Sequence, residues 1–159
     1  MSQMEIVPGL ADVPVAKSAV SLIDGKRARL AYRGIAVETL ARDSSFEETA
    51  WLLLKGELPT QHQLADFNHD LRSRRKIKYK LKEIIKNYPE QGHPMDALQS
   101  SVAALGMFYP ARDVTNAASN WDAALRLIAS MPTLVAAFHR LRNGDEPVTR
   151  FSVPGNEKG

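Results

Sequence analysis

The chain has 159 residues and no cysteine, its formal net charge is +3, and hydrophobic and charged residues make up 44% and 25% of it. A chain of this length can bury one real core, and these proportions are typical of a soluble globular protein. The lack of cysteine excludes disulfides, thiolate zinc sites and a cysteine nucleophile. We find no secretory signal after Met1 and no apolar stretch approaching the ~20 residues that span a bilayer, so we expect a cytoplasmic protein without a membrane contact.

The N-terminal region predicts an extended arm followed by a hairpin. Residues 1–17 contain two prolines and a glycine without periodicity, which indicates the arm. Apolar residues alternate over 18–32 on both sides of Asp24-Gly25, and glycine tolerates the positive φ that tight turns require. We therefore expect a β-hairpin over 18–32. Because a two-stranded hairpin is marginal in water, it must lie against other parts of the protein.

The remainder, up to residue 148, has helical patterns, and residues 149–159 have none and predict an irregular tail. Capping boxes, proline in the first turn and glycine after the last turn mark the helix ends. We expect a short helix at 35–41, a second from the capping residues at 44–48 to Gly56, and a third opened by Thr60 with Gln63. A basic helix ended by Pro89 follows, and then a helix from Pro94 to about Met107. The last helix should run from Ser119 with Asp122 to Asn143-Gly144, with a kink at Pro132.

Two of these helices, about 94–107 and 120–143, are apolar over most of their circumference. A helix that is apolar on several sides must be covered on several sides, and a chain this short has few elements to do so. They are either central core helices or part of a subunit interface. An exposed apolar patch of that size would otherwise favour aggregation. We therefore expect a homo-oligomer, a dimer or a higher assembly, formed through these helices.

A basic run lies between residues 72 and 86. Its cations are Arg72, Arg74, Arg75, Lys76, Lys78, Lys80, Lys82 and Lys86. Such a run could contact phosphates, but apolar residues interleave at helical spacing, and no nucleic-acid motif is present. We expect a solvated helix face and no nucleic-acid partner. A regulatory anion or nucleotide site is the alternative left open.

The histidines predict no metal site. His62 and His69 are seven residues apart, with Asp66 between them and Asp70 directly after, whereas zinc ligands on one helix usually lie four apart. His139 falls in the last turn of a helix, where a cation is favoured by the helix dipole.

His93 precedes Pro94 at the start of a predicted helix. A positive charge is disfavoured there, so we expect a neutral imidazole that caps a backbone N–H and has no catalytic role. We find no Ser/His/Asp triad, no phosphate-binding glycine loop and no acid/base pair. The residues by themselves therefore predict no catalytic, cofactor-binding or metal-binding position and no cofactor.

Several separated motifs nevertheless resemble one family. The stretches GLADVPVAKSAVSLIDG, LAYRGIAVETLA, SSFEETAWLLLKGELPT, GHPMDALQSSVAALGMFYP and IASMPTLVAAFHRLRNGDEP are similar to the N-terminal part of citrate synthase, in the family order, from about Val7 to Val148. RRKIKY followed by GHPMDALQ is most similar to cyanobacterial citrate synthases. 2-Methylcitrate synthases share much of the same pattern.

The resemblance implies an all-α fold, in which this chain is a segment of the large domain with a small N-terminal β-hairpin. It also implies a homodimer in which helices similar to 94–107 and 120–143 pack across the interface. Citrate synthases condense oxaloacetate with acetyl-CoA and hydrolyse the thioester, giving citrate and CoA. Acetyl-CoA and oxaloacetate are therefore expected as partners of a complete chain only.

The departures from the family concern catalysis. The family chain is more than twice as long, and its catalytic His-Gly-Gly-Ala and Asn-Val-Asp stretches follow the matched region and are absent here. No family catalytic residue can be carried onto this sequence. His93 matches the His-Pro-Met element, which is not catalytic, although in some bacterial members its neighbourhood contributes to an allosteric NADH site. After GDEPV the sequence turns to TRFSVPGNEKG, which we interpret as a premature end.

Two functions follow from the sequence. The first is the N-terminal, dimer-forming portion of a citrate synthase, inactive by itself. The second is a truncated citrate-synthase-like protein that acts as a non-catalytic helical assembly module.

Overall fold

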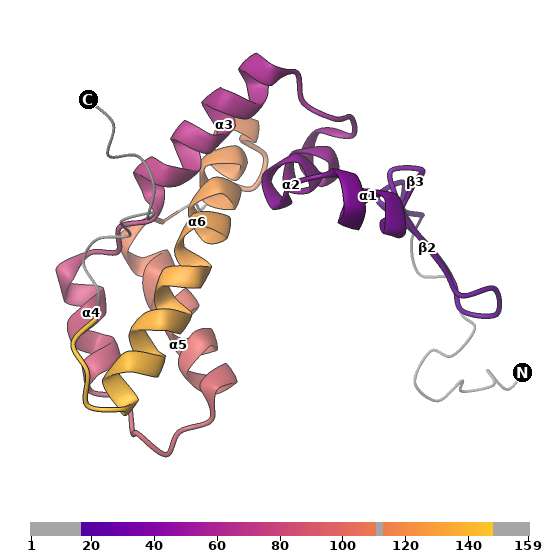
Figure 1. Cartoon of the computed structure of the whole chain (residues 1–159). Coiled ribbons are helices and arrows are strands. Elements are labelled where there is room, and N and C mark those ends of the chain that lie inside the picture. The colour runs from indigo at the N-terminus through magenta and orange to yellow at the C-terminus, as the bar shows by residue number, and fades with distance from the viewer. Residues whose placement is uncertain (1–16, 111–112, 148–159) are drawn as a thin grey trace, which may run out of the picture. The chain divides into compact units, whose positions relative to one another are not determined.

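The computed structural model describes residues 17–110 and 113–147, which form six helices and a small sheet (Figure 1). The expected fold class, mainly helical with a β element near the N-terminus, is confirmed. The expected arm and irregular tail lie almost entirely outside the described residues. The elements are β1 (Ser21–Asp24), β2 (Arg29–Tyr32), β3 (Ile35–Ala36), α1 (Val37–Asp43), α2 (Phe46–Lys55), α3 (Gln61–Arg74), α4 (Tyr79–Lys86), α5 (Pro94–Phe108) and α6 (Ala117–Arg142).

The chain divides into two compact units, Met1–Ala65 and Asp66–Gly159. The described part of the first unit begins with an antiparallel sheet in the order β1-β2-β3. Leu22 pairs with Ala31, and Tyr32 pairs with Ile35. The expected hairpin is present, but the helix expected at 35–41 is displaced. Ile35 and Ala36 form β3 instead, and α1 follows it.

The first turn of this sheet does not place a positive φ on Gly25, as was expected. In the first turn, residues 25–28, the positive φ falls on Ala28 at 50°, and the Asp24 carboxylate accepts a hydrogen bond from the Arg27 N–H at 3.1 Å. The explanation through Gly25 was therefore wrong. In the second turn, Arg33 and Gly34 have φ of 49° and 87°, the two successive positive values of a type I′ hairpin turn.

The expected ends of α2 are confirmed. Ser45 and Glu48 form a reciprocal capping box at its start, with the Glu48 carboxylate 2.7 Å from the Ser45 backbone nitrogen. Gly56 closes the helix with φ of 95°, a left-handed conformation that costs glycine little. Thr60 and Gln63 form the second expected box, at the start of α3.

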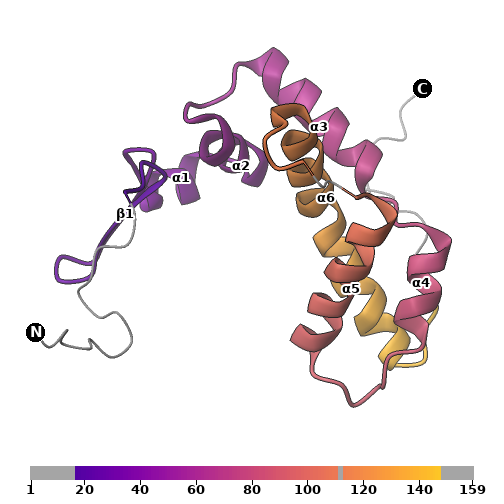
Figure 2. The same ribbon diagram turned by 180° about the vertical axis from the view of Figure 1, so that it is seen from behind.

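The second unit contains the main hydrophobic core. Helices α4, α5 and α6 pack against one another, and both views show them side by side (Figures 1 and 2). The buried residues of this core come from all three helices and the segment before α4. They are Ile77, Leu81, Ile85, Ala97, Ala104, Leu105, Leu134, Ala137 and Phe138.

The basic run is not one helix, contrary to the expectation. Helix α3 ends at Arg74, residues 75–78 are non-helical, and α4 begins at Tyr79. The break has a tertiary cause. Ile77 is buried in the core, and the Arg75 carbonyl accepts a hydrogen bond from the Thr133 hydroxyl on α6 at 3.0 Å.

Helix α6 also starts earlier than expected. Its N-cap is Asn116, whose side chain accepts a hydrogen bond from the Ser119 N–H at 3.0 Å, so Ser119 lies inside the helix. The helix continues through Pro132 and ends at Arg142, and Gly144 has φ of 81°. The expected C-terminal end is therefore confirmed.

The length and composition of α6 correct one further expectation. By its length of 26 residues and its apolar composition alone, α6 could cross a membrane. No apolar stretch of that kind was expected from the sequence. The core helix of a soluble protein passes the same test, and Leu134, Ala137 and Phe138 of α6 are buried in the core formed with α4 and α5.

Candidate functional site

Arg33, Arg42 and Arg112 are arginines outside the basic run that could hold a carboxylate substrate, and the first two each have a partner in the structure. Arg33 donates to the Leu53 carbonyl at 2.9 Å, one of the C-terminal carbonyls of α2 that lack a partner within the helix. Arg42 pairs with its neighbour Asp43 at 2.9 Å. Arg112 lies outside the described residues. Arg33 and Arg42 therefore do not share a binding point in the described residues.

The histidines give no metal centre in the described part of the chain. No group of three or more potential ligand side chains, counting His, Asp and Glu, is placed to hold a metal ion among residues 17–110 and 113–147. Asp70, which directly follows His69 in sequence, instead forms an ion pair with Arg74 at 2.9 Å.

His93 has the expected structural position. It is the N-cap of α5, and its Nδ1 accepts a hydrogen bond from the Met95 N–H at 3.2 Å. Pro94 occupies the first turn, where its missing N–H leaves no donor unsatisfied. The imidazole thus satisfies one of the free N–H groups at the start of the helix.

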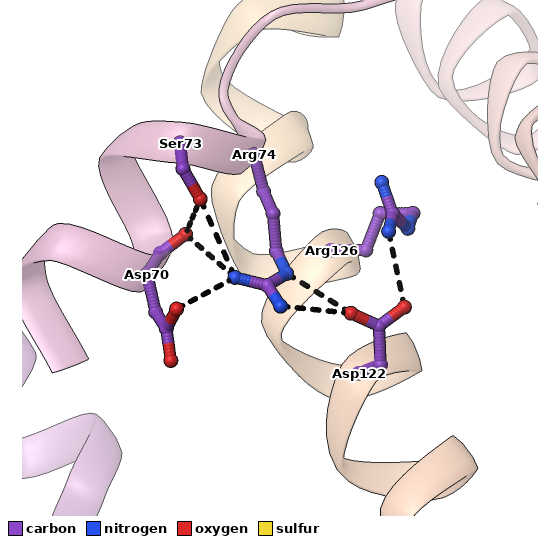
Figure 3. Close-up of polar contacts among 5 residues, drawn as sticks. All are labelled: Asp70, Ser73, Arg74, Asp122 and Arg126. Carbon is purple, nitrogen blue, oxygen red and sulfur yellow. Dashed lines mark hydrogen bonds and ion pairs between the residues drawn. The ribbon is translucent and has the colours of Figure 1, made fainter. Parts of the chain in front are cut away.

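A polar cluster that the sequence did not predict joins the end of α3 to α6 (Figure 3). The Arg74 guanidinium donates to Asp70 at 2.9 Å on one side and to Asp122 at 2.9 and 3.0 Å on the other. The second oxygen of Asp122 accepts from Arg126 at 3.0 Å. Arg74 and Asp122 are 48 residues apart, so no local spacing could have indicated the pair.

The cluster shapes the electrostatics of its members. The hydrogen bond from Arg126, followed by that from Arg74, holds the pKa of Asp122 below its ordinary value, despite the opposing effect of partial burial. Arg126 also stacks 3.7 Å from the centre of the Tyr109 ring, and the Lys78 ammonium lies 4.5 Å from the same ring. These contacts fasten the C-terminal end of α5 to α6 and to the segment before α4.

A groove of about 1110 Å³ runs between the C-terminal end of α5 and the N-terminal half of α6. Tyr109, Asp122 and Arg126 line it, so the polar cluster lies at its edge. Most of its other lining residues are apolar or small. They are Val102, Ala103, Leu105, Gly106, Met107, Phe108, Pro110, Ala118, Ser119, Ala123 and Leu127.

The groove presents apolar side chains beside a polar cluster whose charges are already paired. Its two arginines and Asp122 are paired with one another, so they stabilise the fold instead of presenting free charges. Met107 is 74% exposed on α5, and Leu127 and Val135 are also exposed on α6. Apolar side chains are thus exposed in and beside the groove.

Comparisons with known proteins give the family. The family model described as "Citrate synthase, C-terminal domain" matches residues 9–157. The chain belongs to the citrate synthase family. Citrate synthase from Synechocystis sp. is 51% identical over 88% of this chain, and that from Acidithiobacillus ferridurans is 46% identical over 94%. The 2-methylcitrate synthase of Mycobacterium tuberculosis is 37% identical over 95%.

Solved structures support the same relationship. Citrate synthase from Pyrobaculum aerophilum superposes with a TM-score of 0.78 at 33% identity over 89% of this chain, and that from Thermotoga maritima with 0.76 at 31%. The chain spans 35% of the Synechocystis relative and 40% of the Acidithiobacillus relative. The family and fold expected from the sequence motifs are confirmed, and the match covers a minor part of each relative.

Proposed function

We propose that this chain is the N-terminal, dimer-forming portion of a citrate synthase. In a complete chain, that enzyme condenses oxaloacetate with acetyl-CoA and hydrolyses the thioester to give citrate and CoA. The observation that carries the proposal is the family match over residues 9–157, which accompanies a TM-score of 0.78 to a solved citrate synthase.

The N-terminal assignment rests on motif order. The family model's description names a C-terminal domain, whereas GLADVPV, the hairpin segment and GHPMDALQ follow the order of the N-terminal part of the family chain. We give the motif order more weight, because it locates individual segments and the description names the model as a whole.

We further propose that the 159 residues do not turn over substrate by themselves. Enolising acetyl-CoA requires a carboxylate base at the methyl group and a neutral hydrogen-bond donor at the thioester oxygen. Oxaloacetate requires arginine forks in the same closed cleft. The described residues hold Arg33 and Arg42 on separate partners, and Asp122, the carboxylate that lines the groove, is ion-paired.

Acetyl-CoA is the proposed acyl donor, because the sequence identity of this chain to the citrate synthase named below is higher than its identity to the 2-methylcitrate synthase. The Synechocystis citrate synthase is 51% identical and the Mycobacterium tuberculosis 2-methylcitrate synthase is 37% identical. 2-Methylcitrate has one more methyl group than citrate, so its thioester donor would be propionyl-CoA. The cytoplasm, where such a soluble enzyme would act, is the proposed location.

Activity is tested by following thiol release from acetyl-CoA and from propionyl-CoA in the presence of oxaloacetate. We expect no turnover by the pure 159-residue chain. We expect turnover, faster with acetyl-CoA, by the complete polypeptide isolated from the native source. Turnover by the 159 residues would overturn the proposed inactivity, and a preference for propionyl-CoA would reassign the donor.

The dimer role rests on the outer faces of α5 and α6. Gly106 and Ala103 of α5 are exposed, and a methyl group added at Gly106 would meet no other described residue within 4 Å beyond the adjacent backbone of its own helix. Small residues allow a second helix to approach closely. Burying a few hundred Å² of this surface is worth several kcal/mol at ~25 cal/mol per Å², which is comparable to the stability of a small domain.

Two matched substitutions test the dimer. Met107 on α5 is 74% exposed, and Ile23 in the sheet of the first unit is 76% exposed. We expect light scattering to find dimers or larger assemblies at micromolar concentration for the unchanged chain and for Ile23→Glu, and monomers for Met107→Glu. A monomeric unchanged chain, or equal effects of the two substitutions, would contradict the dimer role.

The alternative function is a non-catalytic assembly module of the same length. It is supported by the exposed apolar side chains of α5 and α6, among them Met107 and Val135, which offer a surface for packing. The mass of the polypeptide in its native source separates the two functions. A mass well above 17.6 kDa supports part of a complete enzyme, and a mass of 17.6 kDa supports the module.

A further inference from the structure

The break in the basic run creates a surface that a continuous helix would not have. Lys76 and Lys78 flank Ile77 in the segment between α3 and α4, and both are exposed while Ile77 is buried. Lys78 has the extended dihedral angles φ −64° and ψ 148°. Lys76 and Lys78 are thus exposed on either side of the buried Ile77, and the Lys78 ammonium lies 4.5 Å from the centre of the Tyr109 ring.

Five cations of residues 72–82 have no ion pair with a carboxylate in the described residues. They are Arg72, Lys76, Lys78, Lys80 and Lys82, and we call them the basic surface. By contrast, Arg74 pairs with two aspartates, and Lys86 pairs with Glu83 and Glu146. Because Glu83 is the one acidic residue between positions 72 and 86, the charges of the basic surface are not compensated locally.

Uncompensated like charges within about a Debye length, ~8 Å at physiological salt, raise the local positive potential and favour an anionic partner. The five charges are spread over eleven successive residues rather than gathered around one point. That distribution fits an anion whose charges repeat along a chain better than it fits a single phosphate. Lysine ammonium groups contact phosphate oxygens as point charges and need no bidentate geometry.

We propose that the basic surface binds a condensed phosphate polymer, namely inorganic polyphosphate. Single-stranded nucleic acid fits less well, because surfaces that bind it combine cations with several stacking aromatic rings. Here Tyr79 is 73% exposed, but the ring of Tyr88 packs against Phe138 at 6.3 Å. This proposal does not depend on the proposed enzyme, since binding is measured without turnover.

Anisotropy of fluorescently labelled polyphosphate, titrated with the 159-residue chain at several salt concentrations, tests it. For about four phosphate contacts, the logarithm of the binding constant should fall with the logarithm of salt concentration with a slope of about −3. The triple variant Lys76→Gln, Lys80→Gln, Lys82→Gln should bind at least ~10-fold more weakly at low salt, with a slope of about −1. Lys78 is left in place because it contacts the Tyr109 ring.

A matched variant removes the same charge from the first unit, through exposed residues of and around the sheet: Lys17→Gln, Lys26→Gln and Arg29→Gln. It should bind polyphosphate as the unchanged chain does, and circular dichroism should show both variants folded. Absence of binding at low salt, or equal weakening in both variants, would overturn the proposal.

A single-stranded oligonucleotide of equal charge serves as the competing probe. We expect it to bind no more tightly than polyphosphate, and we expect Tyr79→Ala to leave polyphosphate binding unchanged. Tighter binding of the oligonucleotide that is lost in Tyr79→Ala would overturn the polyphosphate proposal in favour of nucleic acid.

Discussion

The two compact units are stabilised in different ways. In the described part of the first unit, strand pairing, a capping box and a left-handed glycine organise short elements, and several large apolar side chains, including Leu22 and Ile23, remain exposed. In the second unit, three helices converge on a shared core that includes Leu81 and Leu134. The first unit therefore depends on local hydrogen bonds, while the second depends on contacts between segments distant in sequence.

The largest expected effect distinguishes the two kinds of stabilisation directly. Leu134 is 1% exposed and Leu22 is 59% exposed. Leu134→Ala should lower the free energy of unfolding by about 2–5 kcal/mol, since it leaves a cavity in the core. Leu22→Ala should change it by less than about 0.5 kcal/mol. Urea unfolding measures both, and similar values would show that the units do not differ in this way.

A capping substitution should act locally on the first unit. Ser45→Ala removes the side chain that caps α2 and should cost about 1 kcal/mol. Hydrogen exchange should then accelerate over α1 and α2, residues 37–55, and stay unchanged over α6. Ser45→Asp, which retains an acceptor, is the control and should leave exchange nearly unaltered. Acceleration across the core helices would mean that the units unfold together.

The polar cluster links distant elements of the second unit, and its contribution should depend on pH. The pKa of Asp122 is lowered in the folded state, first by Arg126 and then by Arg74. Its ionised form therefore stabilises the fold above the unfolded pKa of about 3.9, and this contribution is lost as pH falls through the lower folded pKa.

Asp122→Asn should accordingly lower stability at neutral pH by about 1 kcal/mol, a value reduced because Asp122 is partly exposed. Its difference from the unchanged chain should shrink below about pH 4. Asp43→Asn, in the exposed pair with Arg42, is the control and should have no measurable effect. A difference for Asp122→Asn that is constant from pH 7 to 2 would refute the linkage.

The smallest expected effect concerns His93. His93→Ala removes the acceptor at the start of α5 and should cost about 0.5–1 kcal/mol, while His93→Ser should preserve or improve stability because serine is a strong N-cap. Thermal unfolding of both variants measures this. If serine also destabilised the chain, the imidazole would have a role beyond capping.

The sequence by itself determined the helical class, most helix ends and the family. It did so because the signals are local: the Ser45–Glu48 box, the left-handed Gly56 and the His93-Pro94 start each depend on residues within one or two turns. The motif order was sufficient for the family because several separated segments match at once.

Only the tertiary structure decided where the basic run breaks and which charges it leaves free. Ile77 leaves the helical path because it is buried in the core, and Arg74 pairs with Asp122 across 48 residues of sequence. Burial and long-range ion pairing depend on which segments meet in space, and sequence spacing carries no record of that. Local hydrogen bonding therefore fixed the elements, and packing fixed the polar cluster, the groove and the basic surface.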